Sequence, residues 1–209
     1  MTTTAPLTPT TNTAPATVNV TPELSGPVWC DRFPGSRQTL TLNPDFRDKC
    51  DDAFIAAIEA AGGVTDIQST YRPRERAYLM HWSHKIVKNG FDPAEVPAMA
   101  GVNIKWNHST MQASVDAAHL MSTGFGINGL AANTAPSLNT LHMSREAIDI
   151  KIWWTGTLNI ANKDGTITTI NTTPRTGMNL QLKEVGLTYG VKKFIGGNAD
   201  KPHWSTTGH

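Results

Sequence analysis

The stretch Thr140-Leu-His-Met-Ser-Arg-Glu-Ala-Ile-Asp-Ile150 holds a histidine and an aspartate seven positions apart, and the aspartate lies inside an apolar run. A carboxylate among isoleucines is costly to bury unless a positive charge lies beside it. Imidazole nitrogen and carboxylate oxygen are usual ligands of zinc, so His142 and Asp149 predict a metal site. On an unbroken strand an odd separation places two side chains on opposite faces. We therefore expect a bend near Ser144, with His142 on an incoming loop and Asp149 on a strand.

A second stretch near the end of the chain, Asp200-Lys-Pro-His-Trp204, can complete this site. His203 would be the third ligand, and three protein ligands with one open position are typical of catalytic zinc. Asp200 precedes His203 by three residues and would act beside the metal as a general base. Arg72 ends a predicted strand, where a guanidinium can stabilise an oxyanion or remain an ordinary surface arginine.

The pattern of helices and strands predicts the α+β class, with helices packed on a small antiparallel sheet. Apolar residues recur at helical spacing after Asn43-Pro44-Asp45 and stop at Gly62-Gly63, which predicts a scaffold helix. Alternation and turn signals predict the strands and a hairpin. The expected helices span residues 44–61, 73–89, 109–121 and 176–187, and the expected strands span residues 64–71, 150–154, 157–160, 166–170 and 191–194.

Composition limits the organisation and the partners of the chain. Its 209 residues suit one domain, which we place at residues 25–209, after a Thr/Pro-rich arm at residues 1–24 that is too poor in apolar side chains to fold. A net charge of +1 without basic clusters predicts no nucleic-acid partner. No apolar run approaches the roughly 20 residues that span a bilayer, so we expect no membrane insertion. We expect a monomer.

The two cysteines and the remaining histidines carry weaker signals. Cys30 and Cys50 are the only cysteines, and they are either bridged in an oxidising compartment or two small buried thiols. His81 and His84 are three positions apart, but no carboxylate completes a metal motif with them. We interpret both as solvated or packed side chains.

Three motifs in this order resemble those of the zinc peptidases of the D-alanyl-D-alanine carboxypeptidase type. This family includes VanY-like carboxypeptidases, vancomycin-resistance dipeptidases and phage L-alanyl-D-glutamate endolysins. The matching segments are Ser69-Thr-Tyr-Arg72, the span from His142 to Asp149 with Ala147 in place, and Asp200-Lys-Pro-His203-Trp204. The resemblance covers about residues 64–205. At one position the chain departs from the family, because Arg145 stands where glycine is usual, so the bend could differ in shape and a cation could overhang the cleft.

The resemblance implies a Hedgehog/D-Ala-D-Ala peptidase-like fold and one Zn²⁺ per chain. It implies that the zinc ligands are His142, Asp149 and His203, that Asp200 is the catalytic base and that Arg72 is the oxyanion or carboxylate partner. Substrate contacts are expected from Ser69, Tyr71, Arg145 and Trp204.

The substrate that the resemblance implies is the peptidoglycan stem peptide, and an aspartate as base favours L-alanyl-D-glutamate endopeptidase over D-alanyl-D-alanine carboxypeptidase or endopeptidase. The alternative is a non-catalytic zinc-containing module that binds cell-wall peptide. The N-terminus has no basic region followed by an apolar core, so we expect synthesis in the cytoplasm without a signal peptide. A holin or a secretion system would then deliver the protein to the cell wall in the periplasm or outside.

Overall fold

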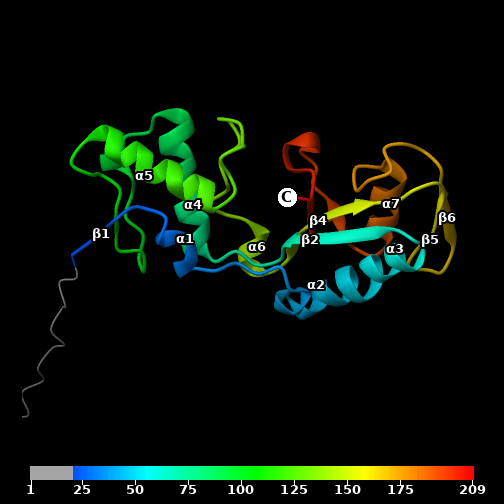
Figure 1. Ribbon diagram of the computed structural model, residues 1–209. Coiled ribbons are helices and arrows are strands. Elements are labelled where there is room, and N and C mark those ends of the chain that lie inside the picture. Colours follow the sequence, from blue (N-terminus) through cyan, green and yellow to red (C-terminus); the bar gives the residue numbers. More distant parts are fainter. Residues whose placement is uncertain (1–20) are drawn as a thin grey trace, which may run out of the picture.

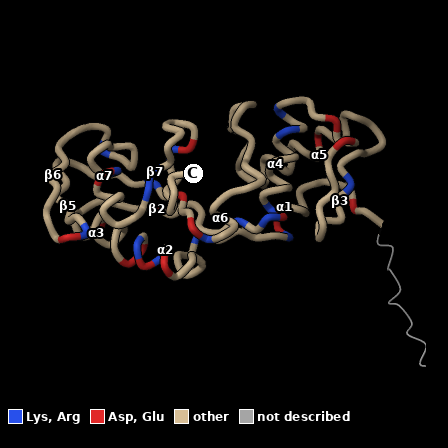
Figure 2. The backbone as a smooth tube through the Cα atoms, turned by 180° about the vertical axis from the view of Figure 1, so that it is seen from behind, with Lys and Arg blue, Asp and Glu red and all other residues tan. Residues whose placement is uncertain are grey.

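The computed structural model describes residues 21–209, and in it the chain forms two halves side by side (Figure 1). One half is mainly helical and the other is built on a sheet, and each half has its own cluster of buried apolar side chains. Figure 2 shows acidic and basic positions interspersed along both halves. Cys30 belongs to the helical cluster and Cys50 to the sheet cluster, and both are buried free thiols. The alternative of a disulfide bridge therefore does not apply.

The sheet half contains a four-stranded antiparallel sheet in the order β2-β4-β8-β7. Ile148, Ile150 and Ile152 alternate along β4 and face the apolar cluster, while Asp149 and Lys151 lie on the other face. A separate hairpin, β5–β6, flanks the sheet. The strands are β2 (Val64–Ser69), β4 (Ala147–Trp153), β5 (Leu158–Ala161), β6 (Ile167–Ile170), β7 (Lys192–Lys193) and β8 (His203–Ser205).

Helical segments cover the isoleucine face of this sheet. The predicted helix at residues 44–61 is one helical run in three pieces, α2 (Pro44–Lys49), a π-helical turn (Cys50–Ile55) and α3 (Ala56–Ala60). The prediction of a regular α-helix was wrong in the middle, where the wider turn brings Cys50, Phe54 and Ile55 into the core together. Helix α7 (Leu180–Thr188) begins later than predicted, because Asn179 caps it.

The helical half is centred on α4 (Arg74–Asn89), which packs against α5 (Met111–Gly124) and α1 (Trp29–Arg32). Both long helices lie close to their predicted positions. Helix α4 ends at Gly90, whose φ of 64° is the left-handed conformation of a helix stop, and α5 begins after the Thr110 cap. Two short parallel strands, β1 (Glu23–Leu24) and β3 (Ile104–Lys105), complete this half. Short 3₁₀ turns lie at Thr39–Thr41, Pro93–Glu95 and Gly197–Asp200.

The described chain thus combines helices with small, mainly antiparallel sheets, which agrees with the α+β class. The predicted arm lies mostly outside the described residues, but its last part is ordered, since Glu23 and Leu24 form β1. Over residues 21–209, no helix combines the length and the apolar character that crossing a membrane requires.

Candidate metal centre and its cleft

A short helix places His142 beside Asp149 of the central strand β4. Helix α6 (Leu141–Ser144) begins at Thr140, which caps the main-chain N–H of His142, and ends at Arg145 with φ 65° and ψ 29°. The predicted bend is therefore present, but His142 lies on a helical turn rather than on an incoming loop. Among the described residues other than glycine, only Arg145 has a positive φ. It adopts the left-handed conformation that glycine adopts most easily, so the chain turns here as it would with glycine.

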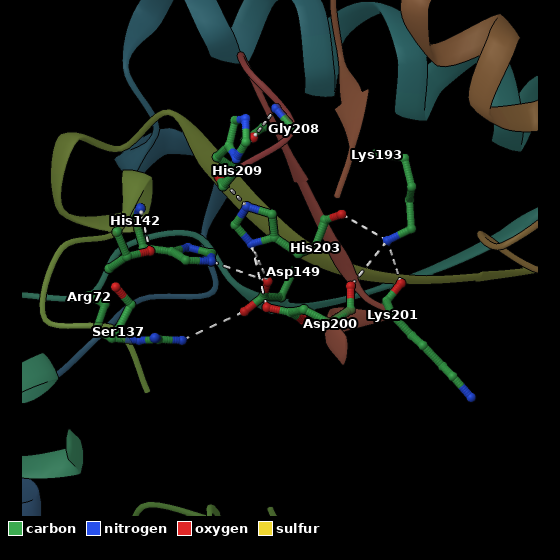
Figure 3. A network of polar contacts seen from close by, with 12 residues as sticks. Arg72, Ser137, His142, Asp149, Lys193, Asp200, Lys201, His203, Gly208 and His209 are labelled. Carbon is green, nitrogen blue, oxygen red and sulfur yellow. Dashed lines mark hydrogen bonds and ion pairs between the residues drawn. The ribbon is translucent and has the colours of Figure 1, made fainter. Parts of the chain in front are cut away.

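The three predicted ligands meet at one carboxylate oxygen (Figure 3). Asp149 and His203 are paired in register on β4 and β8, and α6 brings His142 to the same side. The Asp149 Oδ1 atom lies 3.1 Å from His142 Nε2 and 3.2 Å from His203 Nδ1. All three side chains are buried, and one ligand atom from each lies within 4.8 Å of the others. This spacing is close enough for the group to hold a metal ion.

The protonation of His203 argues for a cation at this point. Its Nε2 atom lies 3.0 Å from the main-chain oxygen of His209, which can only accept a hydrogen bond, so Nε2 carries a proton. In the neutral ring Nδ1 is then a bare acceptor that faces the acceptor Oδ1 of Asp149. The contact is favourable only with a second proton on the ring or with a cation between the two atoms. Histidines that bind a metal through one ring nitrogen usually donate a hydrogen bond from the other ring nitrogen to a carbonyl or carboxylate, as His203 does through Nε2.

The carboxyl of Asp149 is held in its ionised form by the two histidines. Burial acts to raise the pKa of its carboxyl, but the hydrogen bonds and charges of His142 and His203 outweigh burial and hold the pKa well below the ordinary value. The carboxylate therefore stays ionised, as a metal ligand must be. His142 Nδ1 is buried and has no hydrogen-bond partner in the described chain, so only Nε2 is engaged.

Arg72 and Asp200 lie on either side of the triad, as Figure 3 shows. The Arg72 guanidinium is 3.7 Å from Asp149 Oδ2, and its main-chain N–H donates to the His142 carbonyl. An Asp200 carboxylate oxygen is 3.9 Å from His203 Nδ1, and its side chain is 46% exposed, so it can reach a substrate. Burial, and then repulsion from Asp149, raise the pKa of Asp200. A bound cation would act in the opposite direction.

The four predicted substrate contacts have different positions. Ser69 and Tyr71 line a hollow beside the triad, and Ser69 is in register with Asp149 after a bulge in β2. Arg145 lines neither this hollow nor the cleft around the triad, because its guanidinium stacks 4.6 Å from the centre of the Tyr71 ring. Trp204 was predicted wrongly, since it is fully buried on the core side of β8 and packs on Phe54.

A cleft of about 510 Å³ opens over the triad between the two halves. The segment that follows α5 forms a wall of this cleft. Two histidines of α4 hold the segment, since His81 Nδ1 lies 2.7 Å from the Pro136 oxygen and His84 Nε2 lies 3.1 Å from the Ala131 oxygen. Residues that the sequence did not single out also line the cleft, namely Met80, Ile127, Leu130, Thr134, Ala135, Pro136, Ser137, Asn139, Thr140, Phe194, Ala199 and His209.

Lys193 on β7 fixes the segment that carries Asp200 and His203. Its buried amine donates to the carbonyl oxygens of Lys201 and His203, at 2.5 Å and 2.8 Å, and lies over the Trp204 ring. Burial is the main reason why the pKa of Lys193 is lowered, to about 8. No feature of the sequence distinguished this lysine from a surface lysine, because its role depends on carbonyls ordered by the fold.

Comparisons with protein-family models, with curated proteins and with solved structures found no match to this chain. The geometry of the site and the sequence motifs therefore carry the functional argument.

Proposed function

We propose that the protein is a zinc metallopeptidase that hydrolyses peptide bonds in the stem peptide of peptidoglycan. The observation that carries the proposal is the convergence of two imidazole nitrogens and one carboxylate on a single point, with Asp200 and Arg72 beside it at the wall of a cleft. A purely structural site would have no need of an exposed carboxylate and a guanidinium on the open side.

Zinc is the metal that best suits this donor set, because two histidines and one carboxylate with an open side are a common catalytic zinc site. We assign His142 Nε2, Asp149 Oδ1 and His203 Nδ1 as the ligand atoms, with one Zn²⁺ per chain. When bound, zinc would act as a Lewis acid towards a peptide carbonyl and towards water.

The remaining roles belong to side chains of the chain itself. Asp200 would accept the proton of the attacking water and pass it to the leaving amine, since it is the carboxylate nearest to the triad that no ligand contact occupies. Arg72 would donate hydrogen bonds to the oxygen that becomes negative in the transition state. The apolar wall formed by Met80, Ile127 and Leu130 would exclude water from the reacting bond.

The motif resemblance supports the choice of substrate and a Hedgehog/D-Ala-D-Ala peptidase-like fold. An aspartate in the position of Asp200 favours cleavage between L-alanine and D-glutamate, as in phage endolysins. On this proposal the protein works on the cell wall after delivery by a holin or a secretion system.

The decisive experiment digests purified muropeptides with the zinc-loaded protein and identifies the products by mass spectrometry. We expect new ends at the L-Ala–D-Glu bond; cuts at D-Ala–D-Ala would change the assigned bond only. One bound zinc without cleavage would instead support the binding module and would reject the peptidase.

Asp200→Asn separates the proposed base from the ligands. We expect full zinc content and a loss of turnover of about 10²- to 10⁴-fold, which is the usual contribution of a general base. Asp48→Asn, an exposed carboxylate on α2, is the matched control and should leave both quantities unchanged. Loss of zinc in Asp200→Asn would make Asp200 a ligand, and unchanged turnover would remove it from the mechanism.

A further inference from the structure

A second hollow of about 540 Å³ continues from the cleft of the metal centre. The two share Arg72, Asp149 and the apolar residues Met80, Ile127 and Leu130. From the triad the second hollow extends along the open face of β4 to Lys151 and across to Ser36 and Arg37. A substrate bound at the metal centre can therefore continue into it.

The charged side chains that line this hollow are mainly basic. Four cations line it, Arg37, Arg72, Arg76 and Lys151, and Asp149 is the one acidic residue among its lining residues. Asp149 is already engaged by His142, His203 and Arg72. No lining acid is left to balance the other cations.

Two contacts hold the side chain of Arg76, one of these four cations, in place. One of its nitrogens donates to the Cys30 carbonyl at 2.8 Å, and the guanidinium stacks on Phe125. Its pKa is lowered first by burial and also by the charge of Arg72. The two arginines therefore lie close enough to repel each other, and an anion between them would relieve that repulsion.

Arg37 and Lys151 are the two exposed cations of this hollow. Both are exposed, and within residues 21–209 no hydrogen bond or ion pair engages either side chain. Lys151 follows Asp149 by two positions on the same face of β4, which places its backbone about 7 Å along the strand from that of Asp149. Asp66 is its register partner on β2, but Asp66 forms no ion pair with it and does not line the hollow.

We propose that Arg37, Arg76 and Lys151 form a subsite that binds a carboxylate of the substrate next to the scissile peptide bond. The inference rests on the proposed peptidase function and adds the residues that would bind the acidic group beside the cleaved bond. A carboxylate suits this hollow because arginine forks and a lysine amine can surround its two oxygens. Arg37 and Lys151 would be specificity residues without a part in bond cleavage.

The test uses two synthetic stem peptides that differ only in one group beside the scissile bond, a free carboxylate in one and its amide in the other. We expect wild-type protein to cleave the acid with a kcat/KM about tenfold or more higher, as a charge-assisted contact allows. Lys151→Gln and Arg37→Gln should each raise KM for the acid, leave kcat unchanged and reduce this preference. Lys105→Gln, an exposed lysine on β3 in the other half, is the matched control and should keep it. An unchanged preference in both variants would overturn the subsite.

A binding measurement separates this inference from the peptidase itself. Glutarate is titrated into metal-free protein, so that its carboxylates cannot bind a metal, and the affinity is measured by NMR. We expect binding that weakens in Lys151→Gln and in Arg37→Gln but not in Lys105→Gln. If no peptide is cleaved but this pattern holds, the proposed function fails and the anion subsite stands. If glutarate does not bind, or binds all variants equally, the subsite is overturned.

Discussion

The two halves of the molecule contribute different things to the cleft. The sheet half supplies charge, with Asp149 on β4, His203 on β8 and Asp200 just before β8. The helical half supplies an apolar wall through Met80 of α4 and through Ile127 and Leu130 beyond α5. Ligands of a metal must be held in fixed positions, and a central strand hydrogen-bonded on both sides holds them well. A wall that excludes water needs close packing rather than charge. The packed helices provide it, together with the segment after α5 that His81 and His84 hold in place.

Asp149→Asn should have the largest effect, because it removes the charge at the centre of the triad. We expect the variant to lose zinc-dependent stabilisation and, without metal, to lose about 3 kcal/mol of unfolding free energy, since a buried charge cluster loses one member. Urea unfolding with and without zinc measures both. Hydrogen exchange should quicken most in β4 and β8, which carry two members of the triad. Asp66→Asn, an exposed carboxylate on the neighbouring strand β2, is the control, and zinc affinity equal to wild type in Asp149→Asn would refute the ligand assignment.

Leu182→Ala and Leu79→Ala test whether the halves fold together. Each leucine is 0% exposed, Leu182 in the sheet cluster and Leu79 in the helical cluster. Each truncation should cost about 2–5 kcal/mol through lost burial and a cavity. We expect one shared unfolding transition that shifts in both variants, measured by tryptophan fluorescence and circular dichroism. Separate transitions, with only the mutated half affected, would show two independent domains.

Substitution of Arg145, which lies after α6, should have the smallest effect on stability. Arg145→Gly removes a left-handed strain of about 1 kcal/mol. It also loses a cation–π contact of about 0.5–1 kcal/mol with Tyr71. The stability should therefore stay close to wild type. Arg145→Ala loses the contact and keeps the strain, so it should be the less stable of the two. The reverse order in thermal unfolding would mean that the strain is absent.

The sequence was informative wherever a local pattern determines structure. The sequence pattern located α4 and α5 to within a few residues, and alternation located β4 and the hairpin. The three candidate ligands were predictable because an aspartate inside an apolar run needs a positive partner, and histidines can hold a cation against it. The structure places the three within reach of one another, and the identity of the metal remains a prediction.

Other features depend on contacts between distant segments. Trp204 follows His203 and was predicted to contact substrate. Side chains alternate along β8, however, so the Trp204 ring lies in the core. The strand β8 itself is only three residues long, too short for a pattern to indicate it. Lys193 and the wall near Pro136 acquire their roles from carbonyls that meet only after folding. The charged hollow combines residues from five separate segments, so no single motif could reveal it.

The register of β4 also has a consequence for the order of folding. Asp149 is paired with Ser69 on β2 and with His203 on β8, and the last of these is far along the chain. Before β8 docks, only His142 and Asp149 can be neighbours, and two ligands hold zinc weakly. All three candidate ligands are together only once β8 has paired with β4. Metal uptake would therefore follow the pairing of these two strands, and a bound metal would hold them together rather than start their pairing.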